Sequence, residues 1–146
     1  MTVKFKKLND RATTPSYGTA AAAGADLYAN TGGESVKIAP HETKMIYTGL
    51  ALEIPQGYVG LVYARSGIAT KRGLAPANKV GVIDSDYRGE IMVSLHNHSE
   101  TPAEIADGER IAQLVITPYL TADFAEVAEL HDTARGTGGF GSTGTK

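Results

Sequence analysis

The stretch "LALEIPQGYVGLVY", residues 50–63, contains two apolar segments separated by a short turn signal, "PQG". Large apolar residues stand at every second position from Leu50 to Ile54, and again from Val59 to Tyr63. Successive side chains of a strand point to opposite faces, so this spacing is typical of strands that bury one face. The stretch therefore predicts two strands joined by a tight turn.

The same period of two recurs along the chain. It appears in "EIMVSLHN" (residues 90–97), in "RIAQLVI" (110–116) and, as the last such pattern, in "DFAEVAEL" (123–130). The segments are short and are bounded by turn signals such as Asp107 with Gly108. Short strands at intervals of about ten residues favour an antiparallel sandwich or barrel over alternating strands and helices. We predict a single all-β domain.

One short helix is predicted over "SGIATKRG", residues 66–73. Ser66 can cap its start, Lys71 and Arg72 suit its last turn, and Gly73 can end it. The alanine run at 20–23 has helical propensity, but Gly24 follows directly, so a loop or the entry to a strand explains it equally well.

The composition excludes several classes of function. Fourteen lysines and arginines against sixteen acidic residues give a net charge of −2. We therefore expect no nucleic-acid partner and no attraction to an anionic membrane. The chain has no cysteine, which rules out thiol chemistry, and the four histidines offer no metal-ligand spacing better than His96 with His98. No signal peptide or membrane-spanning run is visible, so a soluble, cytoplasmic protein is expected.

Two internal stretches suggest anion chemistry. The first is "ARSG", residues 64–67, which follows the strand that ends at Tyr63. If the helix begins at Ser66, its free backbone N–H groups and dipole form an anion site with Arg65 beside it. An ordinary helix cap explains the same residues.

The second stretch is "GVIDSDYRGE", residues 81–90, which carries two carboxylates at the end of an apolar segment. A carboxylate at a strand end can act as a general base toward water. Asp84 and Asp86 would share one face only if the strand continued through Ser85. A plain Asp-Ser-Asp turn between two strands is the alternative.

The C-terminus reads "ARGTGGFGSTGTK", residues 134–146. We divide the chain into a barrel domain of residues 1–133 and a flexible, glycine-rich arm of residues 134–146. Composition alone favours plain disorder for this arm. A ring such as Phe140 is useful there mainly if it lands on a ligand, and Arg135 could meet phosphates on the same ligand.

Taken in order, five stretches resemble the motifs of the trimeric deoxyuridine triphosphatase (dUTPase) family. They are "AGADLYA" (23–29), "ARSGIA" (64–69), "NKVGVIDSDYRGE" (78–90), "GERIAQLVI" (108–116) and "RGTGGFGSTG" (135–144). The resemblance implies a jelly-roll-like β-barrel with one very short helix, assembled as a homotrimer with active sites at the subunit interfaces. It also implies Mg²⁺-dependent hydrolysis of dUTP to dUMP and pyrophosphate, which limits uracil in DNA and supplies dUMP for dTMP synthesis.

The resemblance further implies which residues bind the base and sugar. Asp84 would be the general base for the water that attacks the α-phosphorus. Tyr87 would pack under the deoxyribose and exclude a ribose 2′-hydroxyl. The remaining residues of this group would form a hairpin pocket for uracil: Asn78, Gly81, Val82, Ile83 and Met92.

The resemblance also implies a second group of residues, which would hold the phosphate chain. Its members are Arg65, Ser66, Gly67 and Gln113. Asp26 would act at one remove, through water near the metal or by orienting Arg65. Mg²⁺ itself would be held through phosphates and water. The arm would add Arg135 for the γ-phosphate, with Phe140 stacked over uracil and Gly141 beside it.

Two alternatives stay open. A dCTP deaminase would share the barrel, but its third motif does not read "DSDYRG". A non-catalytic trimeric scaffold or regulatory binder could retain the pocket, and loss of Asp84 or of the arm would favour it. Both are present. Arg88 and Arg110 also lie inside motifs, but either can be a structural ion-pair residue, so neither joins the candidate site.

Overall fold

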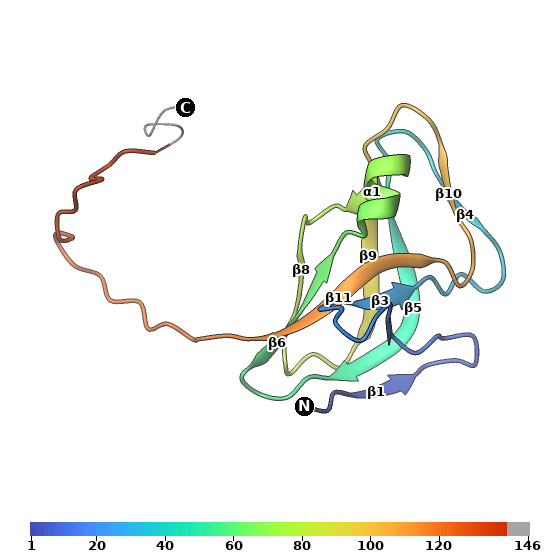
Figure 1. Ribbon diagram of the computed structural model, residues 1–146, viewed down its shortest axis with the longest axis horizontal. Coiled ribbons are helices and arrows are strands. Elements are labelled where there is room, and N and C mark those ends of the chain that lie inside the picture. Colours follow the sequence, from blue (N-terminus) through green and yellow to red (C-terminus); the bar gives the residue numbers. More distant parts are fainter. Residues whose placement is uncertain (140–146) are drawn as a thin grey trace.

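The computed structural model describes residues 1–139, and that range holds one helix and eleven strands (Figure 1). The helix is α1 (Ser66–Arg72). The strands are β1 (Lys4–Lys7), β2 (Ser16–Tyr17), β3 (Ala25–Tyr28), β4 (Val36–Ile38), β5 (Thr43–Glu53), β6 (Tyr58–Tyr63), β7 (Leu74–Pro76), β8 (Gly81–Ile83), β9 (Glu90–Asn97), β10 (Ala103–Ile105) and β11 (Arg110–Pro118).

The strands form two main sheets. Five strands pair in the order β2-β3-β11-β6-β8, and four pair in the order β1-β5-β9-β7. β4 and β10 form a separate two-stranded ribbon. Neighbouring strands are antiparallel throughout these sheets. The predicted preference for antiparallel pairing over alternating strands and helices is therefore confirmed.

The core lies between the two sheets. Leu27 and Leu114 face it from the five-stranded sheet, Ile46 and Leu95 face it from the four-stranded sheet, and none of the four is more than 4% exposed. Burial of this apolar surface is the main term that holds the layers together. The all-β, jelly-roll-like barrel is confirmed.

Strand β9 shows how local pattern becomes structure. Ile91, Val93 and Leu95 are buried, whereas Met92 and Ser94 between them point away from the core. The predicted strand over residues 90–97 agrees with the observed bounds. The alternation leaves the outer face of β9 available to line a site.

The short helix is also confirmed, with one correction at its start. The N-cap is Arg65, in an extended conformation, and it makes no side-chain cap hydrogen bond, so Ser66 is the first helical residue and not the cap. Gly73 ends α1 as predicted, because its φ of 66° is left-handed and favours glycine. The alanine run at 20–23 is loop. No helix in residues 1–139 is both long and apolar enough to cross a membrane.

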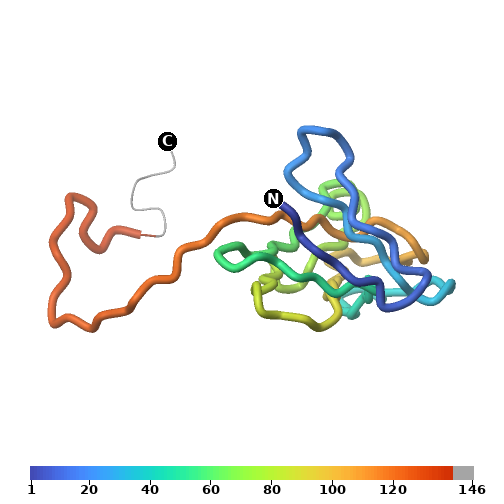
Figure 2. The backbone as a smooth tube through the Cα atoms, turned by 90° about the horizontal axis from the view of Figure 1, so that it is seen from below, coloured from blue at the N-terminus to red at the C-terminus, as the bar shows by residue number. Residues whose placement is uncertain are grey.

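The predicted strand over residues 123–130 is wrong. Within the described range the last strand ends at Pro118, the Tyr119 N–H donates once more to the Gly57 carbonyl, and residues 120–139 then run away from the barrel without pairing to it (Figures 1 and 2). Leu120 and Phe124 are each 98% exposed. A strand requires a neighbouring strand for its backbone hydrogen bonds, and this segment has none among residues 1–139. The domain boundary at 133/134 stays a prediction.

Candidate active site

A cavity of about 260 Å³ opens on one side of the barrel between β8 and β9. Its position follows from the sheet topology, because β7 pairs with β9 in one sheet while β8 pairs with β6 in the other. β7 and β8, which follow each other in the chain, therefore join different sheets. The turn between them places Lys79 at a φ of 66°, with the Lys79 N–H donating to the Pro76 carbonyl at 3.0 Å.

The cavity collects the predicted base-binding and sugar-binding residues. All seven of them line it: Asn78, Gly81, Val82, Ile83, Asp84, Tyr87 and Met92. They come from the turn after β7, from β8, from the loop after β8 and from the outer face of β9. Residues 78–92 are thus folded around one space, as the resemblance implies, although their roles stay predictions.

Asp84 stands directly after β8 and is exposed. The strand ends at Ile83 and residues 85–86 form a turn, so the condition for Asp84 and Asp86 to share a strand face is not met. Asp84 also borders a second, wider polar groove of about 630 Å³ that includes Asp86 and Arg88. Its carboxylate therefore stands where the cavity meets solvent, a position that water can reach.

Tyr87 is held by its own loop. Its hydroxyl donates to the carbonyl of Glu90 at 3.1 Å, and its backbone N–H donates to the carbonyl of Asp84 at 3.2 Å. The phenol ring is thereby kept beside the cavity. A ring fixed in this way can exclude a substituent by shape.

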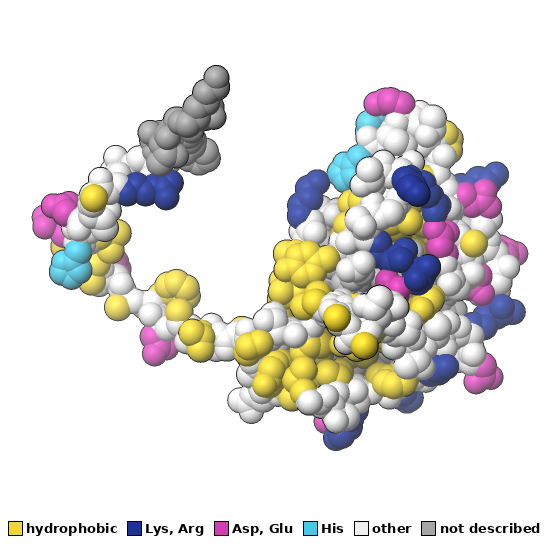
Figure 3. Space-filling model, in the orientation of Figure 1, with side chains coloured by type: hydrophobic (Ala, Val, Ile, Leu, Met, Phe, Trp, Pro, Cys, Tyr) yellow, Lys and Arg dark blue, Asp and Glu magenta, His cyan; other side chains and the backbone are white. Residues whose placement is uncertain are grey.

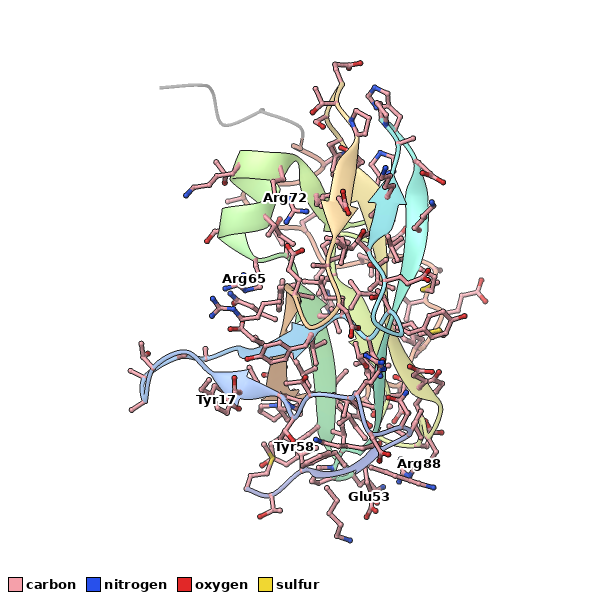
Figure 4. All side chains as sticks on the ribbon, turned by 90° about the vertical axis from the view of Figure 1, so that its right-hand side faces the viewer. Tyr17, Glu53, Tyr58, Arg65, Arg72 and Arg88 are labelled. Carbon is pink, nitrogen blue, oxygen red and sulfur yellow. The ribbon has the colours of Figure 1, made fainter. Side chains whose placement is uncertain are left out.

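A second polar group centres on Asp26 in β3, which is only 6% exposed. Arg65 donates from Nε to Oδ1 of Asp26 at 2.7 Å, and Arg110 donates from Nη1 to Oδ2 at 3.2 Å. Gln113 stands opposite Asp26 in the β3–β11 ladder. Basic side chains gather on the face below α1 (Figure 3), and Figure 4 places Arg65 near the start of that helix.

The two groups are separate within the described part of the chain. Arg65, Ser66, Gly67, Gln113 and Asp26 do not line the cavity that holds Asp84. Arg135 is exposed in the extended segment and donates from Nε to the Gly138 carbonyl at 2.9 Å. The predictions on Phe140 and Gly141 fall outside the described residues.

The comparisons with known proteins agree with this geometry. The family model described as dUTPase matches residues 10–144. The chain belongs to the dUTPase family. Among relatives, the deoxyuridine 5′-triphosphate nucleotidohydrolase of Nautilia profundicola is 54% identical over 144 residues, which cover 99% of each chain. The enzyme of the same name from an Anaeromyxobacter species is 49% identical over 147 residues, covering 99% of this chain and 98% of the relative.

Solved dUTPase structures share the fold. The dUTPase of Staphylococcus bacteriophage 80alpha with dUPNHPP superposes with a TM-score of 0.89 at 32% identity, and the match covers 99% of both chains. A mutant dUTPase of phage phi11 of S. aureus, described with a structural Mg(II) ion, has a TM-score of 0.80 at 27% identity, covering 90% of this chain and 100% of the phage chain.

The chain offers no ready-made metal cage in residues 1–139, where no three His, Asp or Glu side chains lie together in a ligand set. Both oxygens of Asp26 are already paired with arginines. Of the two roles expected for Asp26, the orientation of Arg65 has a visible contact in this structure. The role itself stays a prediction.

Reading the sequence missed cavity residues on the outer face of β9. Glu90 and Ser94 line the cavity, and the signal was available, because they share the outward face of β9 with Met92. Arg110 was left out as a possible structural ion-pair residue. Its ion pair is with Asp26, in the phosphate-side group.

Proposed function

We propose that this protein is a dUTP diphosphatase that hydrolyses dUTP to dUMP and pyrophosphate at the cavity beside Asp84. The observation that carries the proposal is the gathering of seven predicted base-binding and sugar-binding residues around one space. Membership of the dUTPase family supports the same activity. In the cell this reaction limits uracil incorporation into DNA and provides dUMP for dTMP synthesis.

Uracil is selected by the free edge of β8. β8 is the last strand of the five-stranded sheet, paired on one side with β6, so its other edge faces the cavity with backbone groups available. These groups and the Asn78 amide match the donors and acceptors of uracil. Cytosine presents an amino group where uracil has a carbonyl, which leaves a donor facing a donor. Thymine is excluded by its methyl group.

Deoxyribose is selected by Tyr87. The ring packs under the sugar and leaves no space for a 2′-hydroxyl. Because the ring is anchored to the carbonyl of Glu90, it cannot easily move to admit UTP. This discrimination is steric and does not depend on charge.

The phosphate chain is bound by the Asp26-centred group. Arg65 uses Nε for Asp26 and Nη1 for a long contact with the Arg110 carbonyl, which leaves Nη2 of its guanidinium for the phosphate oxygens. The Ser66 hydroxyl, the backbone N–H of Gly67 and the Gln113 amide add donors, since the first N–H groups of a helix have no partner within it. Arg135 of the arm binds the γ-phosphate, and Phe140 and Gly141 cover the uracil.

Asp84 acts as the general base. Its carboxylate accepts the proton of the water whose oxygen attacks the α-phosphorus, and the bond from that phosphorus to the pyrophosphate oxygen breaks. Negative charge develops on the phosphate oxygens during this step. Arg65 and Arg135 supply fixed positive charge and hydrogen-bond donors where that charge appears.

Mg²⁺ fits this chain as an ion that arrives with the substrate. It prefers phosphate oxygens and retained water to an all-protein cage, and the paired oxygens of Asp26 offer it no direct ligand. When bound, the ion neutralises phosphate charge. The residues that hold it are those that hold the phosphate chain.

The active protein is a homotrimer in which different subunits complete one site. Three observations support this assembly: the Asp84 group and the Arg65 group are separate in one chain, residues 120–139 run away from their own barrel, and Leu120 and Phe124 in that segment are almost fully exposed. Apolar side chains so exposed are typical of segments that pack on a partner.

The test is pyrophosphate release with Mg²⁺ from dUTP, dTTP, dCTP and UTP in parallel. We expect release from dUTP alone. Release from dCTP or dTTP at a similar rate would contradict the proposal that the free edge of β8 selects uracil. Absence of release from all four, with dUTP still bound, would leave a non-catalytic binding protein.

A further inference from the structure

Arg110 reaches the phosphate-side group because of an irregularity in β11. In the β3–β11 ladder, Gln113 stands opposite Asp26 and Ala112 opposite Leu27, but the register shifts so that Arg110 stands opposite Tyr28. Two residues of β11 therefore face one residue of β3, which is a β-bulge. Ile111 stays fully buried in the core. Regular alternation would give the place beside Asp26 to residue 111, and the bulge gives it to Arg110.

Arg110 then completes the pairing of a buried charge. Asp26 is 6% exposed, and an unpaired carboxylate at such a place is costly. Arg65 occupies one oxygen and Arg110 the other. With both oxygens held, the carboxylate has one orientation, and that orientation sets the direction in which the Arg65 guanidinium points.

The backbone of Arg110 contributes to the same position. Arg65 donates from Nη1 to the Arg110 carbonyl at 3.5 Å, in addition to its bond from Nε to Asp26. The Arg65 side chain is 22% exposed, whereas that of Arg110 is 50% exposed. Arg65 is therefore the more enclosed arginine of the two, and Arg110 supports it from the outer side.

We propose that Arg110 is a positioning residue for phosphate binding, which acts by holding Asp26 so that Asp26 in turn orients Arg65. This inference rests on the proposed function of Arg65 in binding the phosphate chain. It predicts that loss of Arg110 weakens binding of the triphosphate but not of the nucleoside, because uracil and deoxyribose are bound in the separate cavity.

The experiment compares Arg110→Gln and Arg110→Lys with wild type. The affinity for dUpNHpp is measured by calorimetry, the inhibition constant of deoxyuridine is measured by competition, and kcat and KM for dUTP are measured with Mg²⁺. For Arg110→Gln we expect about tenfold weaker dUpNHpp binding, the size of one charged hydrogen bond, with unchanged deoxyuridine inhibition. Arg110→Lys keeps a cation for Asp26 and should recover part of the loss.

Arg72→Gln is the matched control. Arg72 also pairs with a carboxylate on another element, Glu109, but it does not touch Asp26. It should leave the ratio of the two affinities unchanged. The thermal unfolding midpoint of each variant is also measured. A variant that is generally destabilised should show a lower midpoint and an equal loss of affinity for dUpNHpp and for deoxyuridine.

A double-mutant cycle separates an indirect role from direct phosphate contact. If Arg110 acts through Asp26, the variant that combines Asp26→Asn with Arg110→Gln should bind dUpNHpp no more weakly than Asp26→Asn alone. If the losses of dUpNHpp affinity in the two single variants add in the double variant, Arg110 contacts the phosphates directly and the proposal is wrong. If Arg110→Gln loses as much affinity for deoxyuridine as for dUpNHpp, Arg110 has only a structural role and the proposal is also wrong. Unchanged dUpNHpp binding in Arg110→Gln would also overturn it. Failure of the wild type to turn over dUTP would instead reject the proposed function, and this inference with it.

Discussion

The phenol ring of Tyr87 lies against Gly89. A Cβ atom at position 89 would stand 2.5 Å from the ring carbon Cζ and 2.9 Å from Cε2 of Tyr87, closer than real Cβ atoms approach any neighbour. The ring is also tied to the Glu90 carbonyl through its hydroxyl. The absence of a side chain at Gly89 therefore sets where the Tyr87 ring can lie.

Gly89→Ala should displace the Tyr87 ring and weaken discrimination between dUTP and UTP. We expect the ratio of kcat/KM for the two nucleotides to fall about tenfold, because a shifted ring relieves the clash with the 2′-hydroxyl. Gly18→Ala is the control, since a Cβ at position 18 would meet no atom within 4 Å. An unchanged ratio in Gly89→Ala would remove the Tyr87 ring as the sugar gate.

Asp84→Asn should bind dUpNHpp like wild type but lose roughly 10²–10⁴ in kcat, because the amide cannot accept the proton of the attacking water. Single-turnover kinetics with dUTP measure this loss. Asp86→Asn is the matched control: it removes a carboxylate from the same loop, but Asp86 borders the outer groove and not the cavity. Near wild-type turnover in Asp84→Asn would exclude it as the base.

Phe140→Ala should weaken binding of dUpNHpp by about 1–3 kcal/mol, the range for stacking of one base on an aromatic ring. Phe140 lies outside the described residues, so this prediction depends on the family resemblance. Phe140→Tyr keeps the ring and is expected to bind normally. Should Phe140→Ala bind as tightly as wild type, the ring does not meet the base.

Mixed trimers test whether sites are shared between subunits. Asp84→Asn and Arg65→Gln chains are each expected to be inactive alone. If one site takes Asp84 and Arg65 from different chains, random mixing in equal amounts leaves roughly a quarter of the sites with both native residues. Activity should therefore return after co-expression, and sedimentation should show trimers. No recovery in verified mixed trimers would place both residues in one chain.

Acid stability should depend on Asp107. The backbone N–H of Thr31 donates to its carboxylate at 2.7 Å, and this bond, followed by the Thr31 hydroxyl and Arg11, lowers the pKa of Asp107 below its ordinary value of 3.8. A lowered pKa in the folded state means that the stabilisation is complete above about pH 3.8 and is lost as the pH falls further.

Unfolding midpoints of wild type and Asp107→Asn, measured from pH 6 down to pH 3, test whether Asp107 stabilises the fold above its pKa and ceases to do so in acid. The variant should be less stable at pH 6, and the difference should shrink below pH 4. Glu126→Gln, which removes an exposed carboxylate from the extended segment, is the control and should parallel wild type. Parallel curves for Asp107→Asn would mean that its carboxylate contributes nothing to acid unfolding.

The strands were the most predictable feature of this protein. The pattern from Glu90 to Asn97 gave the bounds of β9, because alternation between a buried and an exposed face is a local property of the backbone. The pattern over residues 123–130 looked equally local, yet that segment forms no strand. A strand depends on a partner for its hydrogen bonds, and the pattern cannot say whether one is present.

The sequence indicated which residues of the candidate site come together in one cavity, while their roles stay predictions. Seven residues between Asn78 and Met92 do surround one cavity, since they belong to one continuous stretch that turns back on itself. Ser66 was expected to cap α1, but Arg65 takes that place and turns its side chain to Asp26 instead. Arg65 pairs with Asp26 because the fold brings β3 beside the start of α1, and the sequence around residue 65 does not contain that information.

The sequence by itself determined the all-β class, the short helix with its glycine end and, through five ordered motifs, the dUTPase family. These depend on residue types and on spacing along the chain. Only the tertiary structure decided that β7 and β8 part to join different sheets, that the β11 bulge brings Arg110 to Asp26, and that Gly89 makes room for Tyr87. Such relationships join residues that are distant in sequence or crowded in space, and they exist only once the backbone has folded.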